Sequence, residues 1–171
     1  MDSALKRNIS WDLKMRLGIL KNIAEGLREL HNADFYHGDV KPHNVLMCDI
    51  GSDRLVLSDF GLSDMNTSEA HRTKTRHTLR TKGTLVYCAP EMLSHDSNNH
   101  TIVAPSRKTD MYAFAILAWE ILTGKISFED VAHNEQKFIS NVHSSDEKLN
   151  RPSLRKLSGT PPEIVEMITA C

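Results

Sequence analysis

The chain has 171 residues, a length that fits one domain, with 40% hydrophobic and 25% charged residues. Its formal net charge of -1 excludes a strong overall attraction to nucleic acid or to an anionic membrane, and no apolar run approaches the roughly 18 residues of a membrane span. Its 3 cysteines match no metal or redox motif and, as an odd number, argue against a disulfide framework, so we expect a reducing, cytoplasmic setting.

The first predicted element is an amphipathic helix over residues 11–31. Leucines recur there at steps of three and four residues, with Lys and Glu between them. Ser10 is the expected N-cap, because its hydroxyl can accept from a free backbone N–H of the first turn. Asp12 suits the first turn, where negative charge is favourable.

A β-hairpin is predicted after a loop over residues 32–44. Residues 45–48 and 54–58 are short β-prone runs, and the polar, glycine-containing residues 49–53 between them suit a turn. Residues 61–84 are polar and rich in Thr, Arg, Lys and His, which indicates a long loop.

The second half of the chain is predicted to be helical. Residues 109–123 are apolar on almost all sides, which is typical of a buried helix, and Gly124 suits the position just after its end. One further helix is expected near residues 133–142, and a last one opens at Thr160-Pro161-Pro162. The expected fold class is therefore mainly α with one small β-hairpin.

Three short segments carry the candidate chemistry. They are His37-Gly38-Asp39-Val40-Lys41-Pro42-His43-Asn44, Asp59-Phe60-Gly61 and Ala89-Pro90-Glu91. In this order, around a hairpin and before a buried helix, they resemble the catalytic loop, the metal-binding loop and the end of the activation segment of eukaryotic protein kinases. The second segment alone is a weak signal, but the ordered set is a strong one.

The resemblance implies a protein-kinase-like C-terminal lobe over residues 1–171, with an activation segment at residues 59–91. A finer similarity is to the tyrosine-kinase-like group of serine/threonine kinases, and within it to the receptor-interacting protein kinases. Residues 108–122 resemble the central helix of that group, and Asn150-Arg151-Pro152 resembles its later Arg-Pro pair.

The same resemblance implies ATP-dependent phosphorylation of serine or threonine in a protein substrate, with Mg²⁺. Asp39 is expected to orient the attacking hydroxyl and accept its proton, and Lys41 to offset negative charge near the transferred phosphate. Asn44 and Asp59 are expected to provide the hard oxygen ligands that magnesium prefers. Leu46 is expected to form the floor beneath adenine or to be a strand core residue, and both roles can hold.

Further residues have expected structural or positioning roles by resemblance. Thr84 is expected to hydrogen-bond the catalytic aspartate and lysine, and Glu91 to form a structural salt bridge rather than act as a catalytic acid. His37 and Phe60 are expected in a stacked apolar column, with a catalytic role as the alternative. Asp110, which opens the central helix, is expected to hold the backbone of the catalytic loop.

Two departures from the kinase pattern are visible. Gly38 stands where the family has an Arg that pairs with a phosphorylated activation-loop residue, so that switch is not expected here. The glycine-rich loop and the lysine–glutamate pair of the N-terminal lobe have no match in residues 1–10. We therefore expect the chain alone to transfer phosphate negligibly and its parent protein to be active.

A pseudokinase-like or truncated interaction module is the main alternative function. Its partner would cover the apolar face around Phe60, Leu46 and Leu30 that the N-terminal lobe would otherwise bury. The retention of all the expected chemical side chains favours the enzyme. In the basic run over residues 71–82, phosphorylation and a plain solvated loop are about equally supported. Nucleic-acid binding is not expected, because no aromatic residue interleaves these charges. Cys88 is expected to be a packed thiol rather than a reactive one.

Overall fold

The structure is a computed structural model that describes residues 11–48, 55–59, 85–93 and 105–171. Within them the fold is mostly helical with one two-stranded antiparallel sheet, as the sequence predicts. Residues 60–84 lie outside the described residues, and they include the predicted loop over residues 61–84 and the site residues Phe60 and Thr84. No helix in these four described ranges is both long and apolar enough to cross a membrane.

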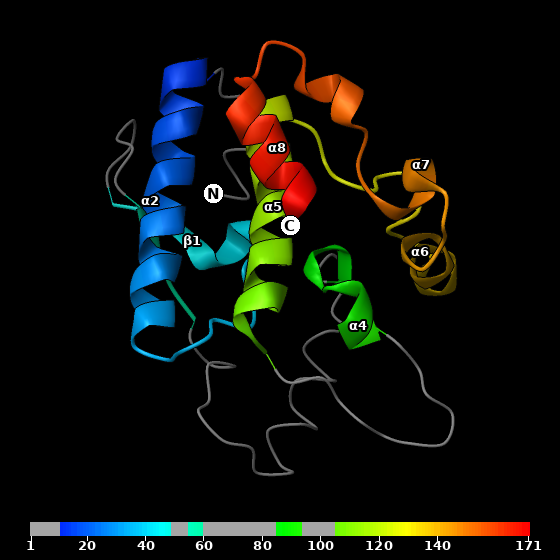
Figure 1. The fold of residues 1–171 in the computed structure, drawn as a ribbon, viewed down its shortest axis with the longest axis horizontal. Helices are drawn as coiled ribbons and strands as arrows, with labels where there is room; N and C mark the ends of the chain where they lie inside the picture. Colours follow the sequence, from blue (N-terminus) through cyan, green and yellow to red (C-terminus); the bar gives the residue numbers. More distant parts are fainter. Residues whose placement is uncertain (1–10, 49–54, 60–84, 94–104) are drawn as a thin grey trace.

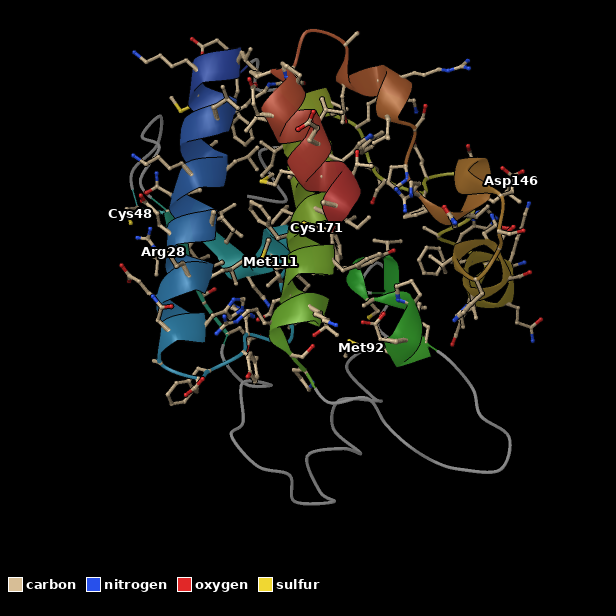
Figure 2. All side chains as sticks on the ribbon, in the orientation of Figure 1. Arg28, Cys48, Met92, Met111, Asp146 and Cys171 are labelled. Atoms are coloured by element: carbon tan, nitrogen blue, oxygen red, sulfur yellow. The ribbon has the colours of Figure 1, made fainter. Side chains whose placement is uncertain are left out.

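Two long helices form the centre of the fold. Helix α2 (Leu13–Asn32) packs along helix α5 (Arg107–Thr123), and helix α8 (Pro162–Ala170) packs on α5 (Figure 1). Buried aliphatic and aromatic side chains fill the space between α2 and α5 (Figure 2). Burial of this shared apolar surface is the main source of stability for the two helices.

Helix α2 begins two residues later than expected, and the N-cap expected at Ser10 is wrong. The cap is Asp12, whose carboxylate accepts from the backbone N–H of Met15 at 2.7 Å. A carboxylate is a good N-cap because it accepts from a backbone N–H that has no partner within the helix, and because its charge is stabilised by the positive end of the helix dipole.

The predicted hairpin is confirmed. Strand β1 (Val45–Met47) pairs antiparallel with strand β2 (Leu55–Leu57), with Leu46 opposite Val56. Alternate residues of a strand face opposite sides, so Val45 is buried in the core whereas Leu46 and Val56 are 51% and 52% exposed. The core role considered for Leu46 is therefore wrong.

Helix α5 is buried on almost all sides, as predicted, but begins earlier than residue 109. Ser106 is its N-cap and forms a capping box with Thr109, which explains the early start. Gly124 follows the last turn with φ 66°, a left-handed conformation that favours glycine, so its predicted place at the helix end is confirmed.

A second, smaller apolar cluster lies beside α5. It joins the 3-10 turn η2 (Leu85–Tyr87), helix α4 (Pro90–Leu93) and helix α6 (Glu135–Val142), the last of which was predicted near residues 133–142. The last helix, α8, begins at the predicted prolines. The sequence did not predict the short elements η2 and α4, nor α7 (Glu147–Asn150) and η3 (Leu154–Leu157).

Candidate active site

The loop after α2 is held by the first turn of α5. Asp110, which is 2% exposed, accepts from the backbone N–H of His37 through Oδ2 and from that of Gly38 through Oδ1, both at 2.8 Å. Gly38 has φ 74°, a conformation in which a side chain would strain the backbone. These two bonds fix the backbone immediately before Asp39.

A second connection joins the end of α2 to the start of α5. His31 Nε2 lies 2.9 Å from Asp110 Oδ2, and Arg107 donates to the carbonyl oxygen of His31 at 2.9 Å. Helix α5 therefore contacts both the end of α2, where the loop begins, and the backbone of the loop itself. The sequence analysis did not identify His31, which lies outside the motif.

The Asp39 carboxylate is buried and held on one oxygen. Its Oδ2 forms an ion pair with Lys41 Nζ at 2.6 Å and accepts from Asn44 Nδ2 at 2.9 Å. The same Nδ2 donates to the Asp39 carbonyl oxygen at 2.8 Å. Three of the residues singled out in the sequence are thus brought together, with charge-assisted bonds that fix the carboxylate.

The hairpin brings Asp59 close to Asn44 in the fold. The Asn44 carbonyl oxygen accepts from both the N–H and the Oγ of Ser58, at 2.9 and 3.2 Å, which extends the strand pairing by one step. Asp59 follows directly, is exposed, and has φ 63°. A left-handed backbone is uncommon for a residue other than glycine, and such outliers cluster at functional sites. The sequence analysis did not identify Ser58 as part of the site.

His37 is fully buried between the loop and the end of β2. Its Nε2 lies 3.2 Å from the Ser58 carbonyl oxygen, and its Nδ1 accepts from the Asp39 N–H at 3.3 Å. Burial lowers the pKa of the ring, although the charges of Asp110 and Asp39 oppose that shift. These contacts fit a neutral imidazole with its proton on Nε2, which braces the loop.

Cys88 is buried near the Asp39–Lys41 pair. Burial raises the pKa of its thiol to about 12, and the negative charge of Asp39 acts in the same direction. Because the thiolate is the reactive form, this thiol is inert at neutral pH, in agreement with the packing role expected for it.

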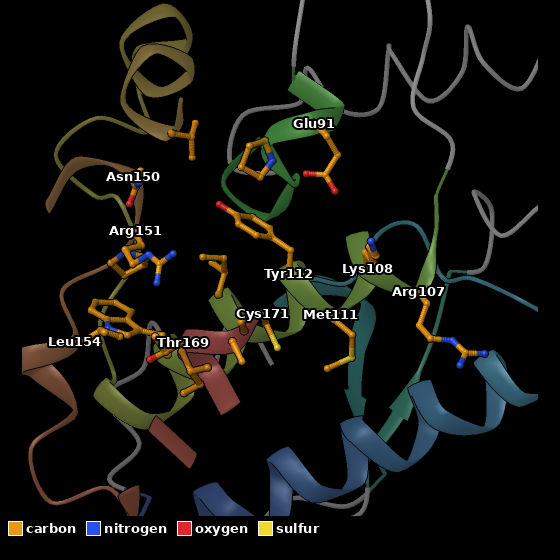
Figure 3. Close-up of a pocket in the computed structure, with 18 residues that line it drawn as sticks. Glu91, Arg107, Lys108, Met111, Tyr112, Asn150, Arg151, Leu154, Thr169 and Cys171 are labelled. Atoms are coloured by element: carbon orange, nitrogen blue, oxygen red, sulfur yellow. The ribbon is translucent and has the colours of Figure 1, made fainter. Parts of the chain in front are cut away.

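Glu91 lies away from this cluster. It is exposed on α4 and borders a groove of about 840 Å³ between α4, α5 and α8, with Tyr112 and Arg151 on the facing walls (Figure 3). The lining of the groove includes none of the residues around Asp39. This groove is therefore separate from the candidate chemistry.

Comparison with known proteins places this geometry in context. The family model described as the protein kinase domain matches residues 1–171. The chain is 31% identical to receptor-interacting serine/threonine-protein kinase 1 of Homo sapiens, over 98% of this chain and 24% of that protein. It is 32% identical to serine/threonine-protein kinase VIK of Arabidopsis thaliana, over 88% of this chain and 31% of that protein.

A third relative is receptor-interacting serine/threonine-protein kinase 2 of Bos taurus, 31% identical over 86% of this chain and 26% of that protein. The similarity to receptor-interacting and other serine/threonine kinases that the motifs indicate is thus confirmed. The chain spans about a quarter to a third of the length of these relatives.

Proposed function

This chain belongs to the protein kinase family, and on that premise we propose that the protein containing it phosphorylates serine or threonine residues of other proteins with ATP. The observation that carries the proposal is the convergence of Lys41 and Asn44 on one oxygen of the buried Asp39 carboxylate. We further propose that residues 1–171 form part of the C-terminal lobe of the domain, with residues 59–91 as its activation segment.

Asp39 is proposed as the group that receives the substrate hydroxyl. With Oδ2 held by Lys41 and Asn44, Oδ1 is the oxygen that we assign to orient the hydroxyl and accept its proton. Lys41 is proposed to place positive charge beside the transferred phosphate, where negative charge develops. The ion pair of 2.6 Å between Lys41 Nζ and Asp39 Oδ2 keeps the ammonium group beside the carboxylate.

Asn44 and Asp59 carry side-chain oxygen atoms of the kind that a magnesium site needs. Asn44 uses Nδ2 toward Asp39, so its carbonyl Oδ1 is the end of the amide that faces away from Asp39. Together with the exposed Asp59 carboxylate it offers the hard oxygens that Mg²⁺ prefers. Magnesium bound with ATP would neutralise phosphate charge. The exposed face of Leu46 is proposed as the floor beneath adenine.

The remaining assignments concern position rather than reaction. Asp110 and His37 are proposed to hold the catalytic loop, in keeping with their hydrogen bonds to its backbone. Thr84 and Glu91 are proposed to position the substrate-binding segment, and Phe60 to pack in the apolar column. Together with Lys41, Thr84 matches the pattern of kinases that act on serine and threonine.

The test uses the longest natural form of the protein that contains this chain. We expect Mg²⁺-dependent transfer of phosphate from ATP to a serine or threonine peptide, lowered about 10²- to 10⁴-fold by Asp39→Asn, because the variant lacks a proton-accepting carboxylate. Asp34→Asn makes the same change at an exposed residue of the same loop and should leave the rate unchanged.

Undiminished transfer by Asp39→Asn would disprove the proposed role of Asp39. ATP binding without any transfer, in every natural form of the protein, would favour the alternative function of a pseudokinase-like interaction module.

A further inference from the structure

The segment between η3 and α8 forms a tight turn. The Thr160 N–H donates to the Leu157 carbonyl oxygen at 3.0 Å, which closes the turn. Ser158 (φ -57°, ψ 129°) and Gly159 (φ 88°) match the two central positions of a type II turn. The second central position needs a positive φ, so glycine is the natural residue there. Ser158 therefore lies at the tip of the turn.

The tip of this turn faces solvent. Ser158 and Gly159 are both exposed. Apart from its chain neighbours, no described residue comes within 4 Å of the position that a Cβ on Gly159 would occupy. Leu157, which precedes the tip, is 3% exposed and anchors the turn in the core. The Ser158 hydroxyl is thus presented to solvent at a defined place on the surface.

Two cations precede this hydroxyl. Arg155 and Lys156 lie three and two residues before Ser158, and both are exposed. Lys156 Nζ lies 5.5 Å from the centroid of the Trp119 ring, a contact that is weak for an exposed cation. Residues 151–162 contain no acidic residue. The segment around the hydroxyl is therefore positive, and its charge lies on the N-terminal side of the serine.

We propose that Ser158 is a phosphorylation site for a second protein kinase, whose peptide-binding groove carries carboxylates that face Arg155 and Lys156. Charge patterns of this kind are a basis of kinase–substrate selectivity, because opposite charges attract and like charges are penalised. In this reaction the protein is the substrate. The site is therefore independent of the activity proposed for Asp39.

The proposed reaction transfers the γ-phosphoryl group of ATP to the Ser158 hydroxyl. A bond forms between the γ-phosphorus and Oγ, and the bond between that phosphorus and the β–γ bridging oxygen breaks. ADP leaves with the electron pair of the broken bond, and the proton of the hydroxyl passes to the base of the second kinase.

A second exposed serine provides a contrast within the chain. Ser140 also follows a cation, Lys137, by three residues, but it lies inside α6, whose Phe138 and Val142 are buried in the smaller apolar cluster. A groove that contacts the acceptor and a residue three positions earlier favours an extended peptide. At Ser140 extension unfolds α6. At Ser158 it opens only the 3-10 turn η3, which has one buried side chain and no side-chain cap.

A phosphate on Ser158 would act on the start of α8. It adds nearly two negative charges three residues before Pro161, the N-cap of a helix that has no side-chain hydrogen bond at its N-cap. Negative charge near the N-terminus of a helix is favourable, because the helix dipole is positive there. We therefore expect phosphorylation to stabilise the first turn of α8.

The first measurement is the rate of phosphate incorporation at each serine, followed by mass spectrometry in the longest natural form of the protein. That protein carries Asp39→Asn, so that its own proposed activity adds no phosphate. The added enzyme is a serine kinase selective for arginine three residues before the acceptor. The rate at Ser158 should lie within about tenfold of the rate for a free peptide of residues 152–164. Ser140 should react at least about a hundredfold more slowly than in a free peptide of residues 134–146.

A matched pair of variants tests the charge pattern. Arg155→Gln is expected to lower the rate at Ser158 at least about tenfold, because it removes the cation three residues before the acceptor. Arg151→Gln makes the same change at an exposed residue seven positions before Ser158 and should leave the rate unchanged. Equal rates in Arg155→Gln and wild type would overturn the inference, and so would a fold that slows Ser158 as strongly as Ser140.

The second measurement compares hydrogen exchange before and after kinase treatment. The Ile164 and Val165 amides both donate to the Pro161 carbonyl oxygen, at 3.0 and 3.2 Å, so their exchange reports on the first turn of α8. Phosphate on Ser158 is expected to slow both about two- to fivefold, and Ser158→Ala should abolish the effect of the treatment. Unchanged or faster exchange in the phosphorylated protein would reject the role assigned to the phosphate. Neither measurement depends on Asp39, so the proposed function and this inference can fail separately.

Discussion

Helix α5 carries a buried carboxylate near each end, Asp110 and Glu120, and different interactions stabilise their charges. Asp110 lies in the first turn, where the helix dipole favours negative charge, and it accepts hydrogen bonds from the backbone N–H groups of His37 and Gly38. Glu120 lies in the last turn, where the dipole disfavours negative charge, and depends on the donors of Tyr87 and Ser127. The dipole of its own helix adds to the tertiary hydrogen bonds of Asp110, whereas at Glu120 the dipole opposes the charge and the contacts with Tyr87 and Ser127 must offset it.

The largest expected effect tests the Asp110 end. We expect Asp110→Ala to lower the free energy of unfolding by about 3–5 kcal/mol, because the buried His31 and the backbone N–H groups of His37 and Gly38 lose a charged acceptor together. Urea denaturation of the chain measures this loss, with the exposed Asp130→Ala as a control that should stay within about 0.5 kcal/mol of wild type. A smaller loss for Asp110→Ala than for Glu120→Ala would reverse the ranking of the two ends.

An intermediate effect is expected at Arg16, which supports the Glu120 end of α5. Its guanidinium donates to the carbonyl oxygens of Ile121 and Leu122, groups that a helix end leaves without internal partners. We expect Arg16→Met to lower the unfolding free energy by about 1.5–3 kcal/mol. Arg28→Met makes the same change at an exposed site of α2 and should have little effect. Equal losses in the two variants would show that the carbonyl contacts contribute nothing.

The smallest expected effect concerns the pH dependence at His37. Burial lowers the pKa of His37 in the folded state, so below pH 6.5 the unfolded chain binds a proton that the folded chain resists. The stabilisation is therefore complete above pH 6.5 and is lost as the pH falls toward the lower folded pKa. The effect is modest because Asp110, Asp39 and Asp59 oppose the shift.

Urea denaturation between pH 7.5 and pH 5 measures this dependence. His37→Gln should flatten the slope in that interval, whereas His133→Gln, at an exposed site, should leave it unchanged. A slope that is identical in wild type and His37→Gln would show that His37 does not titrate differently on folding.

Some errors of the sequence analysis have a local cause. Ser10 and Asp12 are residue types that both suit an N-cap, and they lie two residues apart, so the sequence alone does not decide that Asp12 caps α2. Leu46 has the same β-prone character as Val45, but the face that packs on α2 is set by the register of the hairpin. In both cases the sequence limits the possible N-caps or buried faces, and the folded structure determines which one is used.

The sequence by itself determined the order of the main helices, the hairpin and the candidate chemistry around Asp39. These features depend on periodicity, caps and motifs, whose residues lie within a few positions of one another. Asp110 was identifiable for the same reason, because it opens a recognisable helix. Glu120 was not, since its place in an apolar run suggests nothing about Tyr87, 33 residues earlier. That pairing exists only because η2 packs against α5, and the polar partners of a buried group depend on which distant segments the core brings together.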